Sequence, residues 1–341
     1  REDIAILKEL GATAYRFSIA WPRILPNGTG AVNQKGLAWY QQFVDGLLEA
    51  GIEPFPTLYH WDLPQAQQDR GGWPARDTAK AFADYAGIVL GALGDRVTRW
   101  STLNEPLCSA WLGHLSGDMA PGIEDAQAAF SASHHLLLGH GMAVRAMRAA
   151  APKIEVGIVL NVGPGIPATD SDADREAVRR HDMTDSGWFH DPLYFGTYPQ
   201  EVIDFSGVKM PIESDDMKII SEKLDWHGLN YYFPAKIGDD PTGDGARTTW
   251  NHIDGPKTDM GWGMNAGVMR DFLIKLKDHW KAPKIYITEN GSAWPDTIAA
   301  DGGVHDPERE AYLMDHLTAA AEALDAGVDL RGYFGWSLLD N

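Results

Sequence analysis

The amino-acid sequence predicts an α/β fold in which parallel strands alternate with helices. Seven short runs of apolar, β-branched or aromatic residues each follow a longer stretch of helical periodicity. The runs are almost continuously apolar, as expected for strands covered on both faces. Polar and aromatic residues gather where the runs end, and in parallel barrels the carboxyl ends of the strands carry the functional residues.

The predicted strands are spread along the whole chain. An opening helix, which ends at Gly11, precedes the first of them. The runs are residues 12–21, 51–62, 97–106, 153–164, 224–232, 283–291 and 331–341. Seven such units are close to a (β/α)8 TIM barrel and too many for a small doubly wound sheet. The first run lacks the G-x-G-x-x-G loop of dinucleotide-binding folds, which disfavours that alternative.

Composition narrows the class of protein. The chain has 341 residues, 44% of them hydrophobic, and shows no Pro/Ser-rich linker, so we predict one catalytic domain over residues 1–341. The net charge of −19 argues against nucleic-acid and anionic-membrane partners. A single cysteine, Cys108, excludes an intramolecular disulfide and a cysteine-based zinc cluster. A cytoplasmic location is expected.

The predicted strand ends carry carboxylates, amides and aromatic rings. They are His60-Trp61-Asp62, Asn104-Glu105, Asn161, Asn230-Tyr231-Tyr232, Glu289-Asn290 and Trp336. The 13 tryptophans of the chain either fill a large core or stack on the flat faces of sugars. This set of strand ends has no His/Asp cluster of the kind that binds a metal, so no metal is expected. It also lacks the lysine of a Schiff-base site.

Glu105 and Glu289 are predicted to face one another across the barrel mouth. Two carboxyl groups across a cleft are the minimum machinery of glycoside hydrolysis, provided that one is protonated and the other ionised. A phenol such as Tyr232 could hydrogen-bond to Glu289 and favour its anion. A separation of about 5 Å would mean retention of configuration, and about 6.5–9.5 Å would mean inversion.

Each of these residues could have a structural role instead of a functional one. A single strand-end glutamate is more often an ion-pair member, but two of them beside asparagines favour catalysis. His60 is predicted to contact a substrate hydroxyl and Trp336 to stack on a sugar. Cys108 is interpreted as inert packing, and residues 169–178 as a solvated segment rather than a calcium loop. Three histidines are interpreted as helix packing or surface rather than metal ligands: His134, His135 and His140.

The motifs match a known family. N-E-P at 104–106 and T-E-N-G at 288–291 occur together with Y-H-W-D-L-P at 59–64, D-W-H-G-L-N-Y-Y at 225–232 and G-Y-F-G-W-S-L-L-D-N at 332–341. The chain resembles the β-glucosidases of glycoside hydrolase family 1 from end to end. The resemblance implies a (β/α)8 barrel, retaining hydrolysis of terminal β-D-glucosyl residues, with β-galactosyl and β-fucosyl residues as further candidates, and no cofactor.

The resemblance also implies roles for individual residues. Glu105 matches the acid/base and Glu289 the nucleophile, to which Tyr232 would donate a hydrogen bond. Asn104 matches the amide on the sugar 2-hydroxyl, and Arg16 an arginine close to the nucleophile. The remaining matches are contacts in the subsite of the reacting sugar: His60, Trp61, Asn230 and Trp336.

The family pattern extends beyond both ends of this sequence. It has a strand with a sugar-binding glutamine before the opening helix, and a Phe-Glu-Trp segment after the position of Asn341. We therefore expect a chain truncated at both ends, without the first strand and the last helix of the barrel.

Three alternatives stay open. A 6-phospho-β-glycosidase would need a phosphate grip after Asn341, and a truncated homologue could bind sugars without turnover. An unrelated aldolase-type barrel would need a lysine at a strand end, whereas Lys284 begins its strand. The expected partner is a β-glucoside or an oligosaccharide, and homo-oligomerisation is left open.

Overall fold

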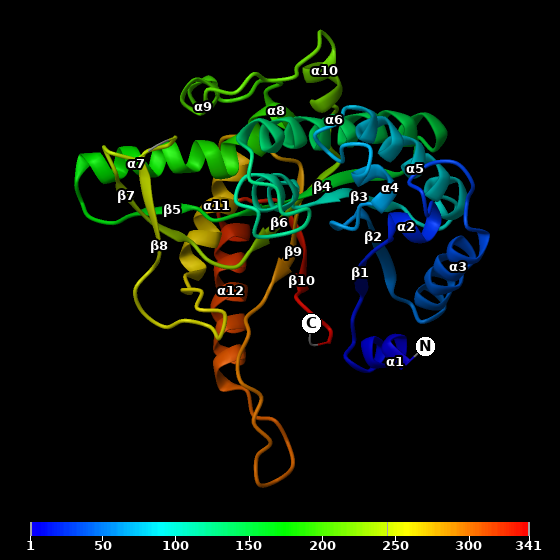
Figure 1. Cartoon of the computed structure of the whole chain (residues 1–341). Coiled ribbons are helices and arrows are strands. Elements are labelled where there is room, and N and C mark those ends of the chain that lie inside the picture. Colours follow the sequence, from blue (N-terminus) through cyan, green and yellow to red (C-terminus); the bar gives the residue numbers. More distant parts are fainter. Residues whose placement is uncertain (1, 244, 340–341) are drawn as a thin grey trace. The chain divides into compact units, whose positions relative to one another are not determined.

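A computed structural model describes residues 2–243 and 245–339 (Figure 1). Arg1 and the last two residues of the 332–341 motif, Asp340 and Asn341, therefore lie outside the described part. The chain divides into two compact units. Unit 1 comprises Arg1–Leu160, Pro192–Thr197 and Gly207–His227, and unit 2 comprises Asn161–Asp191, Tyr198–Ser206 and Gly228–Asn341.

Parallel strands form the centre of unit 1. They are β1 (Ala14–Ser18), β2 (Glu53–Tyr59), β3 (Arg99–Asn104) and the start of β4 (Glu155–Val162). The register aligns Ala14 with Glu53, and Thr57 with Ser101. Helix α1 (Glu2–Glu9) precedes β1, and the longer helices between the strands are α3 (Gln34–Glu49), α5 (Asp77–Leu93) and α6 (Ala126–Ala150). The strand–helix alternation predicted from the sequence is thus observed.

Local signals in the sequence account for the helix ends of unit 1. The side chains of Asn33 and Asp125 accept hydrogen bonds from the first turns of α3 and α6, as N-caps do. Gly11 has φ +73°, the left-handed conformation that favours glycine after a helix. The predicted strand 12–21 is too long, because Trp21 begins the short helix α2 (Trp21–Ile24) with Pro22 in its first turn.

Tryptophans fill much of the core. Trp21 stacks on Tyr85 with ring centroids 5.2 Å apart and lies 5.7 Å from Phe82. Among the largest fully buried side chains are five of the 13 tryptophans: Trp21, Trp73, Trp100, Trp188 and Trp226. These five tryptophans therefore fill the core and do not stack on a sugar.

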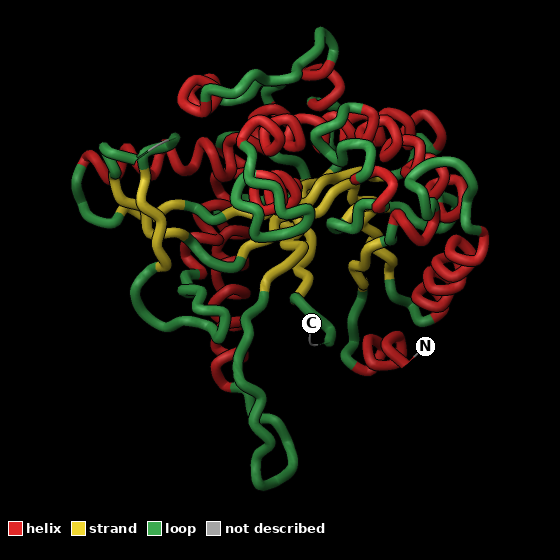
Figure 2. Tube along the Cα trace, in the orientation of Figure 1, coloured by secondary structure: helices red, strands yellow, loops and turns green. Residues whose placement is uncertain are grey.

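Unit 2 continues the strand–helix alternation. Its parallel strands are most of β6 (Trp226–Tyr231), β9 (Lys284–Asn290) and β10 (Leu330–Gly335), with the helices α11 (Ala266–Asp278) and α12 (Pro307–Asp325). Figure 2 shows the segment 291–306, between β9 and α12, as a long loop. The strands pair in the order β1-β2-β3-β4-β6-β9-β10, so the seven predicted runs are the seven strands of this sheet.

A second, three-stranded sheet in unit 2 was not predicted. It consists of β5 (Gly165–Pro167), β7 (Ala235–Asp239) and β8 (Thr248–His252), in that order. Helix α7 (Asp172–Asp182) packs on it, since Ala177 is buried with Ala235 and Ile237. These strands are short, and β8 is mostly exposed, so they lack the apolar runs by which the other strands are recognised.

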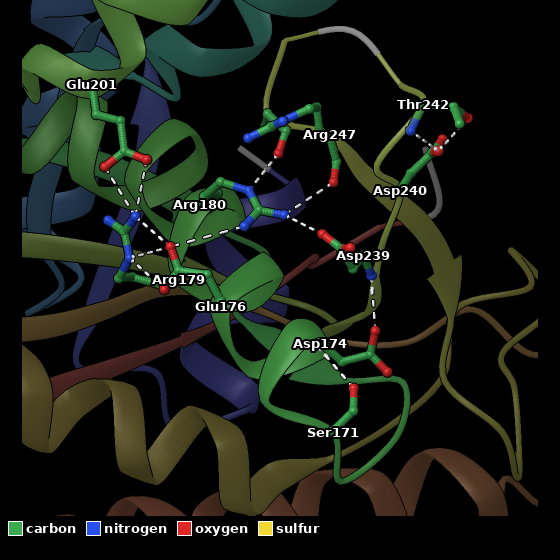
Figure 3. A network of polar contacts seen from close by, with 11 residues as sticks. Ser171, Asp174, Glu176, Arg179, Arg180, Glu201, Asp239, Asp240, Thr242 and Arg247 are labelled. Carbon is green, nitrogen blue, oxygen red and sulfur yellow. Dashed lines mark hydrogen bonds and ion pairs between the residues drawn. The ribbon is translucent and has the colours of Figure 1, made fainter.

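Polar contacts tie α7 to this sheet (Figure 3). Arg180 Nη2 donates to Asp239 Oδ1 at 2.6 Å, and the Asp239 amide donates to Asp174 Oδ1 at 2.8 Å. The Ser171 side chain caps the helix by accepting from the Asp174 amide at 3.1 Å. The segment 169–178 is therefore the capped start of a helix, and most of its residues are exposed, as the solvated interpretation predicts.

The remaining short segments connect the larger elements. They are α4 (Gln65–Gln68), α8 (Trp188–Tyr194), α9 (Gln200–Ser206), α10 (Asp216–Ile220) and the π-helical turns η1 (Cys108–Leu112) and η2 (Met183–Gly187). Within the described residues, none of the helices combines the length and the hydropathy that a membrane crossing requires.

The histidines of α6 are buried packing residues. His134 Nε2 lies 2.9 Å from Asp216 Oδ2, and His140 Nδ1 lies 2.7 Å from Thr102 Oγ1. Burial lowers the pKa of His140 to about 3 and that of His135 to about 4, so both are neutral at pH 7. The packing interpretation is confirmed, and the surface alternative is wrong because the exposed fractions of the three are 0–3%.

Asp216 joins three separate segments of unit 1. Its carboxylate, 1% exposed, accepts from Arg76 Nη1 at 2.8 Å and from the Glu213 amide at 2.8 Å, and it contacts His134. Burial opposes its ionisation, but the hydrogen bonds from Arg76, Glu213 and His134 outweigh burial and hold the pKa of Asp216 well below its ordinary value. The ion pair with Arg76 links α10 to the start of α5, and the hydrogen bond with His134 links α10 to α6.

Replacing Asp216 by alanine should lower the free energy of unfolding by about 3 kcal/mol at pH 7, because Arg76 and His134 lose their shared buried partner and Arg76 is left with the exposed carboxylate of Glu213. A carboxyl group with a depressed pKa stabilises the fold above about pH 4 and loses this effect as the pH falls further. The difference in the free energy of unfolding between wild type and variant, measured by urea titration, should therefore become smaller below pH 4. Asp172→Asn, which removes an exposed ion pair, is the control and should change the free energy of unfolding little. An equal loss of stability in both variants would contradict the stabilising role of Asp216.

Candidate active site

Glu105 follows the last residue of β3 in unit 1. Its side chain is only 6% exposed, and its backbone has φ +46°, which is uncommon for a residue other than glycine. The Glu105 amide still pairs with the carbonyl of Val159 on β4 at 2.9 Å. The carboxyl group is thus held at the strand end by a backbone that leaves the extended conformation at this residue.

Asn104 connects the ends of three strands. Its Oδ1 accepts from Arg16 Nη2 of β1 at 2.5 Å, and its Nδ2 lies 3.3 Å from Nε2 of His60, which follows β2. The Asn104 carbonyl accepts from Trp61 Nε1 at 3.1 Å. Since Nδ2 can only donate, His60 Nε2 acts as the acceptor in this contact. Four of the predicted site residues therefore share one hydrogen-bond network.

Two residues near Asn104 have properties that the sequence did not reveal. Trp61 has φ +78° and an exposed fraction of 37%, so its ring is open to a ligand. Burial raises the pKa of Asp62 to about 6, although backbone hydrogen bonds oppose the shift. The Y-H-W-D-L-P motif places both residues at the strand end but does not show their burial or backbone conformation.

Cys108 touches Glu105. Its Sγ lies 3.3 Å from Glu105 Oε2, and its amide donates to the Glu105 carbonyl at 3.0 Å. The residue is buried, as the packing interpretation predicts, and its thiol also lies against the carboxyl group.

Glu289 lies near the carboxyl end of β9 in unit 2, with an exposed fraction of 4%. Tyr232, directly after β6, donates from its Oη to Glu289 Oε2 at 2.6 Å. This confirms the predicted phenol–carboxylate hydrogen bond. The neighbouring Tyr231 points to another partner, because its Oη donates to the Asn265 carbonyl at 2.6 Å.

Asn290 is the second amide that ties strand ends together. Its Nδ2 donates to the Tyr231 carbonyl at 2.7 Å and to Tyr312 Oη at 2.8 Å, and its Oδ1 accepts from Tyr333 Oη. These contacts join β6, α12 and β10 to β9. The sequence placed Asn290 beside Glu289 but gave no indication of this structural role.

Asn230 and Trp336 occupy the other predicted positions in unit 2. Asn230 is fully buried, and its Oδ1 accepts from Thr288 Oγ1 at 2.7 Å. Trp336 is 39% exposed, and its amide donates to the Asn290 carbonyl at 3.0 Å. Trp336 is thus partly open to solvent, whereas the Asn230 amide is engaged within the protein.

Glycine is required after Glu289-Asn290 for a steric reason. A Cβ atom on Gly291 would lie 2.1 Å from the carbonyl oxygen of Trp336, which is backbone and cannot turn aside. The T-E-N-G motif therefore combines a carboxylate, an amide that joins strands and a glycine that lets two backbone segments approach.

Comparisons with known proteins show the family to which the chain belongs. A family model described as glycosyl hydrolase family 1 matches residues 1–341. The chain belongs to glycosyl hydrolase family 1. Beta-glucosidase A of Thermotoga maritima is 47% identical to this family 1 chain over 343 residues, which cover 100% of the chain and 77% of that protein. The β-glucosidase of an Agrobacterium strain is 44% identical over 344 residues, covering 100% of the chain and 75% of the relative.

Solved structures of the family show the fold. A family 1 β-glucosidase from Thermotoga maritima, in complex with isofagomine lactam, matches this family 1 chain with a TM-score of 0.95 and 46% identity. The match covers 100% of the chain and 77% of that structure. The predicted TIM-barrel class is therefore confirmed.

Gly291→Ala should destabilise this family 1 protein by about 1–3 kcal/mol, since an added methyl group forces the backbone of Trp336 to move. Thermal unfolding measured by circular dichroism would test this. Gly207→Ala is a matched control, because Gly207 has nothing within 4 Å of an added Cβ, although its φ of +67° carries a conformational cost. A smaller loss at Gly291 than at Gly207 would contradict the steric argument.

Proposed function

We propose that the protein is a retaining β-glucosidase that hydrolyses terminal β-D-glucosyl residues. The observation that carries this is the 2.6 Å hydrogen bond from the Tyr232 phenol to the buried Glu289 carboxylate, which suits a nucleophile held in one orientation. Membership of glycosyl hydrolase family 1 supports the reaction class, and the β-glucosidases at 44–47% identity support glucose as the sugar. β-Galactosides and β-fucosides are the further substrates to test.

In the proposed mechanism Glu289 and Glu105 act in two displacement steps. The Glu289 carboxylate attacks the anomeric carbon while the bond to the leaving oxygen breaks, and Glu105 gives its proton to that oxygen. Water then attacks the glycosyl–enzyme ester, Glu105 takes a proton from the water, and the bond to Glu289 breaks. The two inversions together retain the β configuration.

The network around Asn104 supports a sugar-binding role in unit 1. Asn104 Nδ2 and His60 offer polar groups beside Glu105, and Arg16 orients the Asn104 amide through its Oδ1. We propose that Asn104 holds the 2-hydroxyl of the reacting sugar and that His60 holds another hydroxyl. Arg16 is proposed to keep a fixed positive charge in the site.

The aromatic and amide residues complete the proposed sugar subsite. Trp61 and Trp336 have exposed fractions of 37% and 39%, which suits stacking against a sugar face. Asn230 is proposed to line the site beside Tyr232. No metal or cofactor takes part in the proposed reaction. A single catalytic domain and a cytoplasmic location are further parts of the proposal, and homo-oligomerisation stays open.

Glu289→Gln should abolish release of nitrophenol from an aryl β-glucoside, because the amide cannot form the covalent intermediate. Glu105→Ala should lower kcat/KM on the order of 10²–10⁴-fold for a poor leaving group and much less for dinitrophenol, which needs no proton. NMR of the first-formed sugar should show the β anomer. An α product, or activity that survives both substitutions, would refute the proposal.

Tyr232→Phe should lower kcat/KM by roughly 10–100-fold, because one hydrogen bond to a charged group is lost. Tyr231→Phe is the matched control: it removes a hydroxyl from the adjacent tyrosine, whose hydrogen bond goes to Asn265. This control should lower the melting temperature and leave kcat nearly unchanged. If the two variants lose equal activity, the phenol has no specific role at Glu289.

A further inference from the structure

Cys108 and Glu105 are in contact through both side chain and backbone. The thiol Sγ lies 3.3 Å from Glu105 Oε2, and the Cys108 amide donates to the Glu105 carbonyl at 3.0 Å. Both side chains are buried, with an exposed fraction of 6% each. A thiol is a weak hydrogen-bond donor, and an ionised carboxylate is the acceptor to which it donates best.

The backbone around this pair is unusual at both residues. Glu105 has φ +46°, and Cys108 begins the π-helical turn η1. Left-handed conformations of ordinary residues and π-helical turns both cluster at functional sites, because regular structure does not favour either. Here they bring a side chain three positions further along the chain back onto the carboxyl group.

We propose that Cys108 is a positioning residue for the carboxyl group of Glu105. This rests on the proposed function, in which Glu105 is the acid/base. The thiol proton holds Oε2, so the proton that Glu105 transfers to the leaving oxygen is carried by Oε1. The same hydrogen bond stabilises the ionised form of Glu105, which takes a proton from water in the second step.

Other charged or titratable groups of unit 1 lie near this pair. Arg16 on β1 and His60 after β2 reach Asn104, the residue before Glu105, and His114 contacts the carbonyl of Ser109 in η1. The Cys108 thiol, which donates to Glu105 Oε2, is itself uncharged. Removal of the thiol should therefore change the titration of Glu105 without removing a charge.

The test is the pH dependence of kcat/KM for 4-nitrophenyl β-glucoside in wild type, Cys108→Ala and Cys108→Ser. Cys108→Ala removes the donor, whereas Cys108→Ser keeps a hydroxyl donor in the same place. The alkaline limb, which reports loss of the acid proton, should move to higher pH by up to about one unit in Cys108→Ala. In Cys108→Ser it should stay near wild type or move to lower pH.

Three controls separate positioning from packing. Ser109→Ala alters the next residue of the same turn and should leave the alkaline limb in place. Cys108→Val, which fills the space without a donor, should behave like Cys108→Ala and replaces it if the alanine variant does not fold. With 2,4-dinitrophenyl β-glucoside, whose leaving group needs no proton, the alkaline limb should differ less among all variants.

Two results would overturn the proposal. One is an alkaline limb that coincides in wild type, Cys108→Ala and Cys108→Val. The other is an equal shift in Cys108→Ala and Cys108→Ser, since volume rather than the donor would then be responsible. If the wild-type chain hydrolyses neither substrate, the proposed function itself fails and the role of Cys108 falls with it.

Discussion

Hydrogen bonding between parallel strands is the constraint on which the candidate site depends. In unit 1 the register aligns Arg16 with Phe55, and Tyr59 with Leu103, so the residues that follow β2 and β3 emerge at the same edge. Arg16, His60 and Asn104 then meet in one network although they are up to 88 positions apart in the sequence. Without this register, none of these polar residues would be near another.

Each glutamate has an asparagine neighbour that ties strand ends together. Asn104 precedes Glu105 and joins groups from β1 and β2, and Asn290 follows Glu289 and joins β6, α12 and β10. A buried amide has two donors and an acceptor, so it can satisfy several segments at once. In both units a carboxyl group is thereby held next to a residue that cannot move without breaking several hydrogen bonds.

Large side chains fill the core around the strands. Large aromatic rings pack beneath the strand ends, as the contacts of Trp21 with Tyr85 and Phe82 show. His135 and His140 of α6 are neutral at pH 7 and hydrogen-bonded, and Asp216 links α10 to α6 through His134 and to the start of α5 through Arg76. These buried polar groups thus form contacts within the protein that stabilise the fold. The number of histidines alone is therefore a poor guide to function.

The sequence by itself determined the alternation of strands and helices, the seven strand segments and the polar residues at their ends. Apolar runs and motif spacing are local properties, so they can be recognised in the sequence without knowledge of tertiary contacts. Tertiary structure alone decided that the thiol of Cys108 reaches Glu105, that Asn290 joins three elements and that β5, β7 and β8 form a second sheet. These features depend on backbone turns and on partners distant in sequence, such as the φ of Glu105 and the approach of Trp336 to Gly291, and no local pattern encodes them.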